Sequence, residues 1–237
     1  MLLRLKAFAK RFTLRAMRWR RLPAKYLHGV GVEIGALHNP LRTKARVKYV
    51  DRLSRADLRR QYPELASLAV VDPDIVDDGE KLHKVADGSQ DIIIANHFIE
   101  HCENPIGTLQ TFSSKLRPRG VIYMAIPDKR YTFDRRRPST TFDHLVTDFG
   151  DNGAASRSQH HFEFAKLACF DEPASDEQAS KVAAKHIADN YSIHFHVWTL
   201  VEFKDFLEQA RERFFPQLTV LESVQNGDEG IFILQCQ

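Results

Sequence analysis

Cysteine is scarce in this sequence, and the cysteines present form no paired pattern. Only three occur in 237 residues, at Cys102, Cys169 and Cys236. No C-x-x-C pair is found among them, so the spacing favours neither a disulfide framework nor a thiolate metal cluster. This usage predicts a reducing, cytoplasmic setting.

Long apolar runs are also missing. No stretch approaches the run of about 18 apolar residues that indicates a membrane-spanning helix. Hydrophobic residues make up 43% of the chain and charged residues 27%. This balance excludes a disordered or collagen-like chain and predicts a globular protein with one sizeable core.

Acidic residues are absent from the first 25 positions, although the rest of the chain is rich in them. The first 25 residues hold nine Lys and Arg, which leaves 34 − 9 = 25 basic against 31 acidic residues, a balance of −6. Leu5, Phe8 and Phe12 recur there at three- and four-residue steps, which predicts one apolar stripe on a basic amphipathic helix.

Three interpretations of residues 1–25 stay open. The helix could pack its stripe on the rest of the protein, or it could lie on a membrane surface with its basic side chains on anionic lipid. The third is nucleic-acid binding or a cleaved targeting peptide. Interleaved charges argue against a signal peptide, and the acidic remainder argues against nucleic acid as a partner. We expect peripheral membrane contact at most.

Strand and helix patterns alternate along the rest of the chain. Strands are predicted at residues 30–34, 46–50, 74–76, 91–95 and 121–126, and the segment 91–95 is an almost continuous apolar run. Helical patterns cover residues 55–65, 105–116 and 199–213, and residues 218–223 and 231–235 predict a closing hairpin. The order predicts an α/β fold, a doubly wound and mostly parallel sheet that ends in an antiparallel hairpin.

Polar residues and glycines follow the predicted strands, where doubly wound sheets bind their ligands. Glu33 and Gly35 close the first strand, and Asp51 closes the second. The residues that follow the third and fourth strands are Asp77, Asp78, Gly79, Asn96 and His97. An acid at the end of the second strand suits ribose hydroxyls, and a glycine lets the backbone approach a ligand. We therefore expect one nucleoside-type ligand at this edge.

Several motifs occur in a familiar order: "VEIG", "VKYVDR", "DDGEKL", "SQDIIIANHFIEHCENP" and "LRPRG". Together they resemble the class I S-adenosylmethionine-dependent methyltransferases, in particular a subgroup associated with glycosyltransferases and polysaccharide assembly. The resemblance implies a Rossmann-like fold with S-adenosylmethionine as cofactor. It also implies that Glu33, Gly35 and Ala36 contact the methionine part, Asp51 the ribose, and Asp78 with Gly79 the adenine. Asn96 and His97 would lie nearest the methyl group.

The first loop departs from that family's pattern. The family continues with further glycines, whereas Gly35 is followed by "ALHNP". Only nine residues separate Gly35 from Ala45, and a mean helix has about 11 residues. The first crossover helix should therefore be short or absent. A dinucleotide would need the missing glycines and a helix N-terminus for its pyrophosphate, so a phosphate-free cofactor fits better.

Histidines are the natural bases for removing a proton from an acceptor hydroxyl. The catalytic candidates are His97, His101, Asp128, His194 and His196, with His144, His160 and His161 also in reach of the same region. The segment from about 129 to 191 is too long for a simple connection, so we expect an inserted helical lid over the acceptor pocket within a 26–237 methyltransferase domain. Its arginine-rich start, "DKRYTFDRRRP", could hold an anionic acceptor or could be a solvated loop.

The "HFIEH" segment matches the H-x-x-E-H spacing of inverted zinc peptidases. A peptidase is disfavoured here, because the segment lies within a sequence that resembles a methyltransferase. A divalent ion at His97, Glu100 and His101 is an alternative, because some O-methyltransferases carry an E-x-x-E-H metal site, but we expect no metal. The predicted function is O-methylation of a sugar, glycan or glycolipid hydroxyl. The alternatives are another small-molecule hydroxyl, or a non-catalytic binding module with a degenerate fold.

Overall fold

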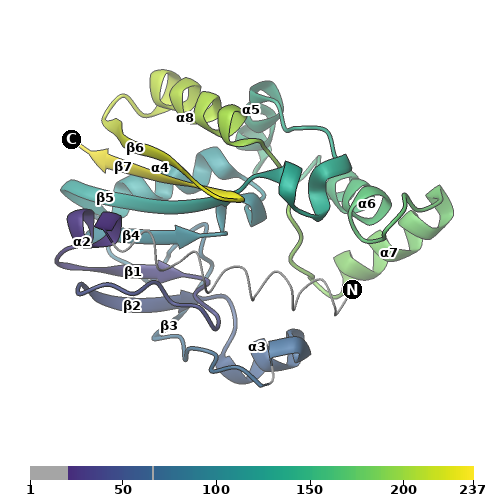
Figure 1. Cartoon of the computed structure of the whole chain (residues 1–237), viewed down its shortest axis with the longest axis horizontal. Coiled ribbons are helices and arrows are strands. Elements are labelled where there is room, and N and C mark those ends of the chain that lie inside the picture. Colours follow the sequence, from purple (N-terminus) through teal and green to yellow (C-terminus); the bar gives the residue numbers. More distant parts are fainter. Residues whose placement is uncertain (1–20, 66) are drawn as a thin grey trace.

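A computed structural model of the protein describes residues 21–65 and 67–237. Its centre is a seven-stranded sheet with the order β3-β2-β1-β4-β5-β7-β6 (Figure 1). The strands are β1 (Val30–Ile34), β2 (Arg46–Asp51), β3 (Ile75–Val76), β4 (Gln90–Asn96), β5 (Leu116–Pro127), β6 (Leu218–Asn226) and β7 (Glu229–Cys236). The predicted doubly wound sheet with a closing hairpin is confirmed.

Six of the seven strands run in the same direction, and β7 runs against them. β1 pairs with β2 and β4, β2 with β3, and β4 with β5, all in parallel. β7 is antiparallel to both β5 and β6, because a tight hairpin joins β6 to β7. The carboxyl ends of the parallel strands therefore meet at one edge of the sheet. The start of β7 joins the same edge, since Pro127 pairs with Glu229.

Seven α-helices lie in the described part of the chain. They are α2 (Arg21–Tyr26), α3 (Arg55–Gln61), α4 (Pro105–Lys115), α5 (Phe142–Asp151), α6 (Arg157–Leu167), α7 (Asp176–Ala188) and α8 (Leu200–Phe214). Short 3-10 turns are η1 (Pro63–Leu65), η2 (Ile99–His101), η3 (Lys129–Tyr131) and η4 (Phe133–Arg136). The predicted helix over residues 1–25 lies largely outside the described residues, and only its end corresponds to α2. No helix in the described ranges is long and apolar enough to cross a membrane.

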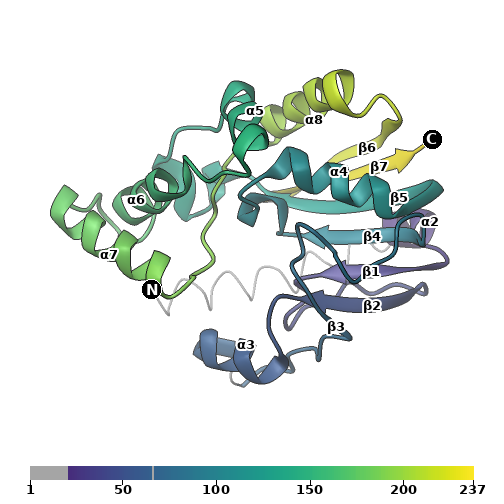
Figure 2. The same ribbon diagram turned by 180° about the vertical axis from the view of Figure 1, so that it is seen from behind.

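Local sequence signals place the two main helices. Asn104 caps α4 by accepting a hydrogen bond from the Gly107 amide, and Pro105 occupies the first turn, where no backbone donor is needed. Thr199 and Glu202 form a capping box at the start of α8. Both helices pack on the same face of the sheet, with α5 beside them (Figure 2).

The two faces of the sheet are covered differently. The larger core lies between the sheet and α4, α5 and α8, and it includes the buried rings of Trp198, Phe203 and Phe232. On the other face a smaller apolar cluster is closed by α2 and by the chain around Leu41 and Ala45.

A loop replaces the first crossover helix, as the sequence predicted. Between β1 and β2 the described chain contains no helix. Gly35 turns the chain with φ +65°, and its amide donates to the Val50 carbonyl at 3.0 Å. The carbonyl of Leu37 accepts from the Val71 amide at 2.7 Å, which fixes the loop against the segment before β3.

The lid segment, residues 129–191, contains η3, η4 and the helices α5, α6 and α7. It projects from the edge at which the parallel strands end (Figure 1). The chain then returns through residues 192–199, without regular structure, to α8.

Candidate functional site

Glu33 lies near the end of β1 with 2% of its surface exposed. One carboxylate oxygen accepts a hydrogen bond from the Leu41 amide at 2.8 Å. Among the described residues the other oxygen has no hydrogen-bond partner, although it is buried. Burial raises the pKa of Glu33 to about 7, partly offset by the Leu41 hydrogen bond. An acceptor atom of this kind is ready for a donor from outside the chain.

Asp51, Asp77 and Asp78 follow β2 and β3 side by side. The Asp77 amide donates to the Asp51 carbonyl at 2.9 Å. Burial raises the pKa of Asp51, partly offset by the backbone amides of Leu53, at 3.4 Å, and Arg52. Asp77 accepts from the Asp78 and Lys84 amides, so it stabilises the turn. Asp78 is exposed and accepts from the Glu80 amide.

Phe98 forms a wall of this edge that the sequence did not predict. A Cβ built on Gly79 would lie 2.7 Å from the Phe98 ring and 2.6 Å from an Ile34 methyl group. A Cβ on Gly35 would meet only the same ring, at 4.0 Å. Phe98 thus lies between the two glycines, and Gly79 is a glycine because the ring approaches its backbone. Ala36, next to Gly35, is half-buried in the loop.

Asn96 and His97 end β4. The Asn96 amide oxygen is buried and has no hydrogen-bond partner within the described ranges. His97 adopts φ +50°, a left-handed conformation uncommon for a residue other than glycine. Its ring contacts Glu229 at 2.8 Å and Glu100 at 3.5 Å. Burial lowers the pKa of His97, but the two carboxylates outweigh it and raise it to about 10. His97 is therefore an imidazolium at neutral pH.

His101 and His194 meet beyond His97. Their rings lie edge to face at 4.6 Å. His101 Nδ1 contacts the Ile193 carbonyl at 2.8 Å, and burial together with His194 lowers the His101 pKa to about 4. His194 Nδ1 lies 2.6 Å from the Asp134 carboxylate. Although burial raises the pKa of Asp134, attraction to His194 and Arg137 lowers it, so Asp134 is ionised and His194 Nδ1 carries the proton.

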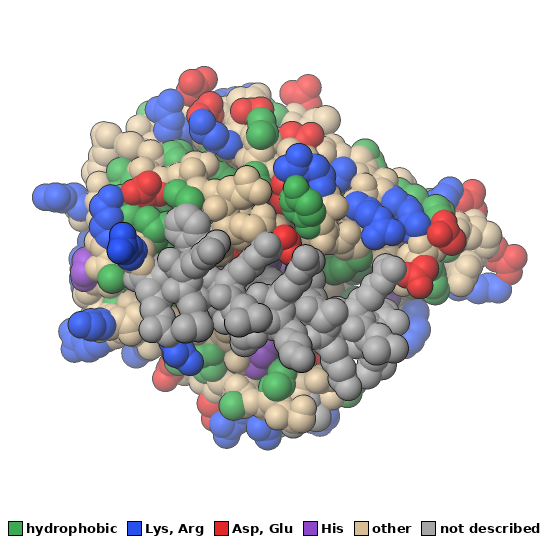
Figure 3. Space-filling view, viewed as in Figure 1, with side chains coloured by type: hydrophobic (Ala, Val, Ile, Leu, Met, Phe, Trp, Pro, Cys, Tyr) green, Lys and Arg blue, Asp and Glu red, His purple; other side chains and the backbone are tan. Residues whose placement is uncertain are grey.

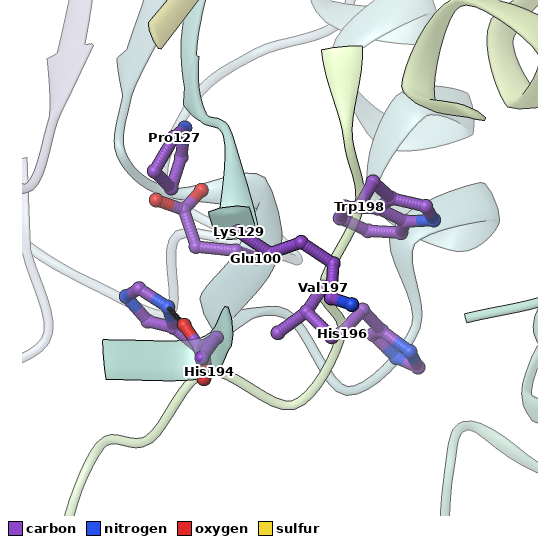
Figure 4. Close-up of a pocket in the computed structure, with 8 residues that line it drawn as sticks. Glu100, Pro127, Lys129, His194, His196, Val197 and Trp198 are labelled. Atoms are coloured by element: carbon purple, nitrogen blue, oxygen red, sulfur yellow. Dashed lines mark hydrogen bonds and ion pairs between the residues drawn. The ribbon is translucent and has the colours of Figure 1, made fainter. Parts of the chain in front are cut away.

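A narrow pocket lies beside these groups at the ends of β4 and β5, and it is closed in this structure, with no room for a water molecule. Its lining includes Glu100, Pro127, Lys129, His194 and Trp198. Figure 4 shows the Glu100 carboxylate and the His194 ring on one side of this pocket, with Trp198 and His196 on the other. Glu100, His101 and His194 each bring one potential ligand atom within 4.8 Å of the others.

Asp128 and three of the arginines that follow it have partners within the protein. Arg130 binds both oxygens of the Asp128 carboxylate, and although burial raises the pKa of Asp128, Arg130 lowers it. Arg136 contacts Glu172 at 3.4 Å. Arg137 is buried and donates to Asp134, to Glu163 and to two backbone carbonyls. The "DRRR" stretch is therefore largely occupied within the lid segment.

His196 faces away from His194. In an extended segment His194 and His196 would lie on one side, with Phe195 and Val197 on the other. The structure differs, because His194 contacts Asp134 whereas His196 contacts Asp148. His196 points into the lid segment, where its Nε2 lies 3.6 Å from the Asp148 carboxylate. His144 and His160 approach the same carboxylate. His161 is buried next to His160, but burial lowers its pKa to about 4 and it takes no part in this group.

Four residues of this region were missed by sequence reasoning: Phe98, Asp134, Asp148 and Glu229. A sharper reading of the hairpin could have found Glu229. β7 was predicted to begin at residue 231, and extending it to residue 229 would have aligned Glu229 with Pro127 at the carboxyl end of β5.

Comparison with known proteins gives one family and many similar folds. A family model described as a methyltransferase domain matches residues 8–210 of the chain. No curated protein matches this chain. A solved protein from Pyrococcus horikoshii is 18% identical, with 95% of this chain and 92% of that chain covered and a TM-score of 0.54.

Two further structures are similar at lower TM-scores. A SAM-dependent methyltransferase from Thermotoga maritima is 14% identical, with 99% of this chain and 97% of that chain covered and a TM-score of 0.46. The 1,6-didemethyltoxoflavin-N1-methyltransferase of Burkholderia thailandensis was solved with 1,6-didemethyltoxoflavin and S-adenosylhomocysteine. It is 13% identical over 94% of this chain and 76% of that chain, with a TM-score of 0.48. At 18% identity, the likeness to the Pyrococcus horikoshii protein concerns the fold.

Proposed function

We propose that this chain, which belongs to the class I S-adenosylmethionine-dependent methyltransferases, transfers the methyl group to a hydroxyl of a sugar, glycan or glycolipid. The observation that carries the acceptor chemistry is the pair of His194 and Asp134 beside the pocket, which is an arrangement for removing a proton.

The edge of the sheet that carries Glu33, Gly35, Asp51, Gly79 and Asn96, called the cofactor edge below, suits S-adenosylmethionine. Glu33 and Asn96 each have a buried oxygen without a hydrogen-bond partner among the described residues. Hydrogen-bond donors on a ligand would satisfy these two acceptors. We infer that these oxygens, with the backbone at Gly35 and Ala36, hold the methionine part. Asp51 would accept from the ribose hydroxyls, and the adenine would lie along Phe98 and Gly79, near Asp77 and Asp78. When bound, the cofactor supplies a methyl group activated by its sulfonium.

His194 is our choice for the general base. Asp134 accepts the Nδ1 proton, so the Nε2 lone pair of His194 is available to take the proton of an acceptor hydroxyl. His97 is a poor base because it is already protonated at neutral pH. Asp128 is paired with Arg130, and His196 is turned into the lid segment. His101 would orient His194 through its ring contact.

The surface next to the pocket suits a carbohydrate. Tyr131 is 53% exposed and Phe133 48% exposed, and Phe133 packs against His194 with ring centroids 4.8 Å apart. Arg130 lies over the Tyr131 ring at 5.6 Å. Figure 3 shows basic and hydrophobic side chains next to each other on this part of the lid segment. Flat rings bordered by hydrogen-bond donors suit a polyhydroxylated acceptor that has both an apolar and a polar side.

The basic N-terminal segment would bring the enzyme to its acceptor. Residues 1–25 carry nine Lys and Arg and no acid. We propose that they make peripheral contact with an anionic membrane surface from the cytoplasmic side, where a glycolipid acceptor is displayed.

The test is a methyl-transfer assay with radiolabelled S-adenosylmethionine and cell-envelope extracts. We expect label in the glycan or glycolipid fraction, its loss in Asp51→Ala through failed cofactor binding, and its loss in His194→Ala with binding retained. Label in protein or RNA instead would refute the acceptor. Absence of binding heat on titration with S-adenosylmethionine would favour the alternative of a non-catalytic module.

One observation favours a second mechanism at the same pocket. Glu100, His101 and His194 are close enough to share a divalent ion that would bind the acceptor oxygen. In that case chelation would abolish turnover, and added metal would restore it. With His194 as a simple base, turnover would survive chelation at temperatures where the protein stays folded.

A further inference from the structure

A second histidine group lies inside the lid segment, away from the cofactor edge. His144 and Asp148 are one turn apart on α5, His160 is on α6, and His196 is in the segment that leads to α8. Asp148 and His196 are at most 1% exposed, His160 is 10% exposed and His144 37% exposed. The methyl-transfer chemistry proposed above uses none of the four.

We propose that His144, Asp148, His160 and His196 form a structural binding site for one divalent transition-metal ion, with zinc the best match. Three imidazole nitrogens and one carboxylate oxygen are a familiar ligand set for zinc.

The distances in this group match a metal site. The Nε2 atoms of His144, His196 and His160 lie 3.1, 3.6 and 3.7 Å from one oxygen, Oδ2 of Asp148. The Nε2 atoms of His144 and His160 are 3.0 Å apart. Ligand bonds of about 2.0 to 2.1 Å in a tetrahedron put neighbouring ligand atoms about 3.3 Å apart. All four ligand atoms lie within 4.8 Å of one another.

Hydrogen bonding alone does not explain the group. Despite three nearby nitrogens, Asp148 Oδ2 has no hydrogen-bond partner of acceptable geometry in the described part of the chain. One of the two nitrogens, His144 Nε2 and His160 Nε2, can donate to the other at 3.0 Å, but that proton is then not available to Asp148 Oδ2, which gains no donor from this pair. A cation between the four atoms satisfies every lone pair at once.

A neighbouring residue prepares the carboxylate. Ser156 donates to the other Asp148 oxygen, Oδ1, at 2.5 Å, which leaves Oδ2 for an ion. Partners of this kind orient metal ligands. Nδ1 of His196 has no partner among the described residues, so the support comes through Asp148.

The ion would join two helices of the lid segment, α5 and α6, to the chain that leaves it. Four protein ligands leave no open position, which is typical of structural zinc. His196 is two residues after His194, so a metal there would also fix the chain that carries the proposed base. The proposal does not depend on methyl transfer, because metal content is measured on the protein itself.

The first experiment measures metal in the full-length protein. We expect about one zinc per chain after dialysis against zinc-free buffer, and a lower melting temperature after chelation that zinc restores. Replacement by cobalt(II) should give the visible absorption of tetrahedral nitrogen and oxygen ligands. Protein that takes up no zinc in a direct titration would overturn the proposal.

Variants locate the ion. His160→Ala should lose the metal, whereas His101→Ala, which removes a histidine of the pocket group, should keep it. The reverse result would assign the ion to the pocket and overturn the proposal. If His160→Ala does not fold, Ser156→Ala tests the site instead, because this variant keeps all four proposed metal ligands. We expect it to bind zinc about 10-fold more weakly, and unchanged affinity would contradict the site.

Discussion

The cofactor edge and the lid segment treat their buried polar groups in opposite ways. At the cofactor edge, Glu33 and Asn96 keep buried oxygens without hydrogen-bond partners among the described residues. In the lid segment and at its two ends, several buried acids are matched to cations: Asp128 with Arg130, and Asp134 with both Arg137 and His194. Asp148 Oδ2 is an exception, and the proposed metal would relieve it. Buried polar atoms without hydrogen bonds lower the stability of the folded state, so a ligand that binds Glu33 and Asn96 should stabilise the cofactor edge.

This difference indicates which interactions stabilise each region. The cofactor edge should become more stable against unfolding when a ligand binds, since the ligand supplies the missing hydrogen-bond donors. The lid segment holds itself together through ion pairs and, on our proposal, a metal. Four substitutions test this contrast, from the largest expected effect to the smallest.

Removal of Arg137 should have the largest effect on stability. Arg137→Ala leaves the Asp134 carboxylate and two backbone carbonyls without their donor in a buried place. We expect a loss of about 3 to 5 kcal/mol in the free energy of unfolding, measured by urea denaturation. The neighbouring Arg136→Ala, which breaks a contact with the exposed Glu172, should cost less than about 1 kcal/mol. Equal losses would contradict the contrast.

Removal of His194 should affect the rate while sparing the cofactor. We expect His194→Ala to lower kcat by about 10²- to 10⁴-fold, because the base is lost. The dissociation constant for S-adenosylmethionine, measured by calorimetry, should stay at the wild-type value. A variant that retains most of its kcat would remove His194 from the mechanism.

Replacement of Glu33 should change how stability depends on pH. The pKa of Glu33 is raised from 4.5 to about 7 in the folded protein, so between these values the folded state keeps a proton that the unfolded state loses. Stability therefore falls as pH rises through this window, by up to about 3 kcal/mol at pH 8. Glu33→Gln should be more stable than the wild type at pH 8.

That advantage should disappear at pH ~3.5, below both pKa values, where Glu33 is largely protonated in both states. Urea denaturation of the ligand-free proteins at both pH values gives the comparison. A difference that does not depend on pH would mean that the Glu33 carboxyl is not buried as described.

A methyl group at residue 79 should disturb the wall of the cofactor edge. Gly79→Ala would place a Cβ 2.6 Å from Ile34 and 2.7 Å from Phe98. We expect a loss of about 2 kcal/mol and weaker cofactor binding. Gly88→Ala is the matched control, because Gly88 has φ +59° and open surroundings. It should cost about 1 kcal/mol through backbone strain and leave cofactor binding unchanged.

Sequence patterns were sufficient for the parallel part of the fold. β1, β2 and β4 are short segments rich in β-branched or aromatic residues that end at or next to a polar residue or a glycine, and their order predicts a doubly wound sheet. The missing crossover helix followed from the count of residues after Gly35. These features are local, so the sequence carries them directly.

Groups assembled from distant parts of the chain were not predictable in this way. Asp134 lies in an arginine-rich stretch that resembles a solvated loop, and nothing nearby indicates that His194, 60 residues later, will contact it. Asp148 meets His196 only because the lid segment folds back on itself. Likewise, the alternation expected for His194 and His196 fails because the two side chains contact different carboxylates.

The insertion of β7 between β5 and β6 has a consequence for how the protein folds. β5 finds its neighbour more than a hundred positions further along the chain, since Val121 pairs with Gln235. Such long-range pairing is slow, and until it forms, an apolar strand is left with an unpaired margin. Refolding at high concentration should therefore favour aggregation, and dilute conditions or a chaperone should raise the yield.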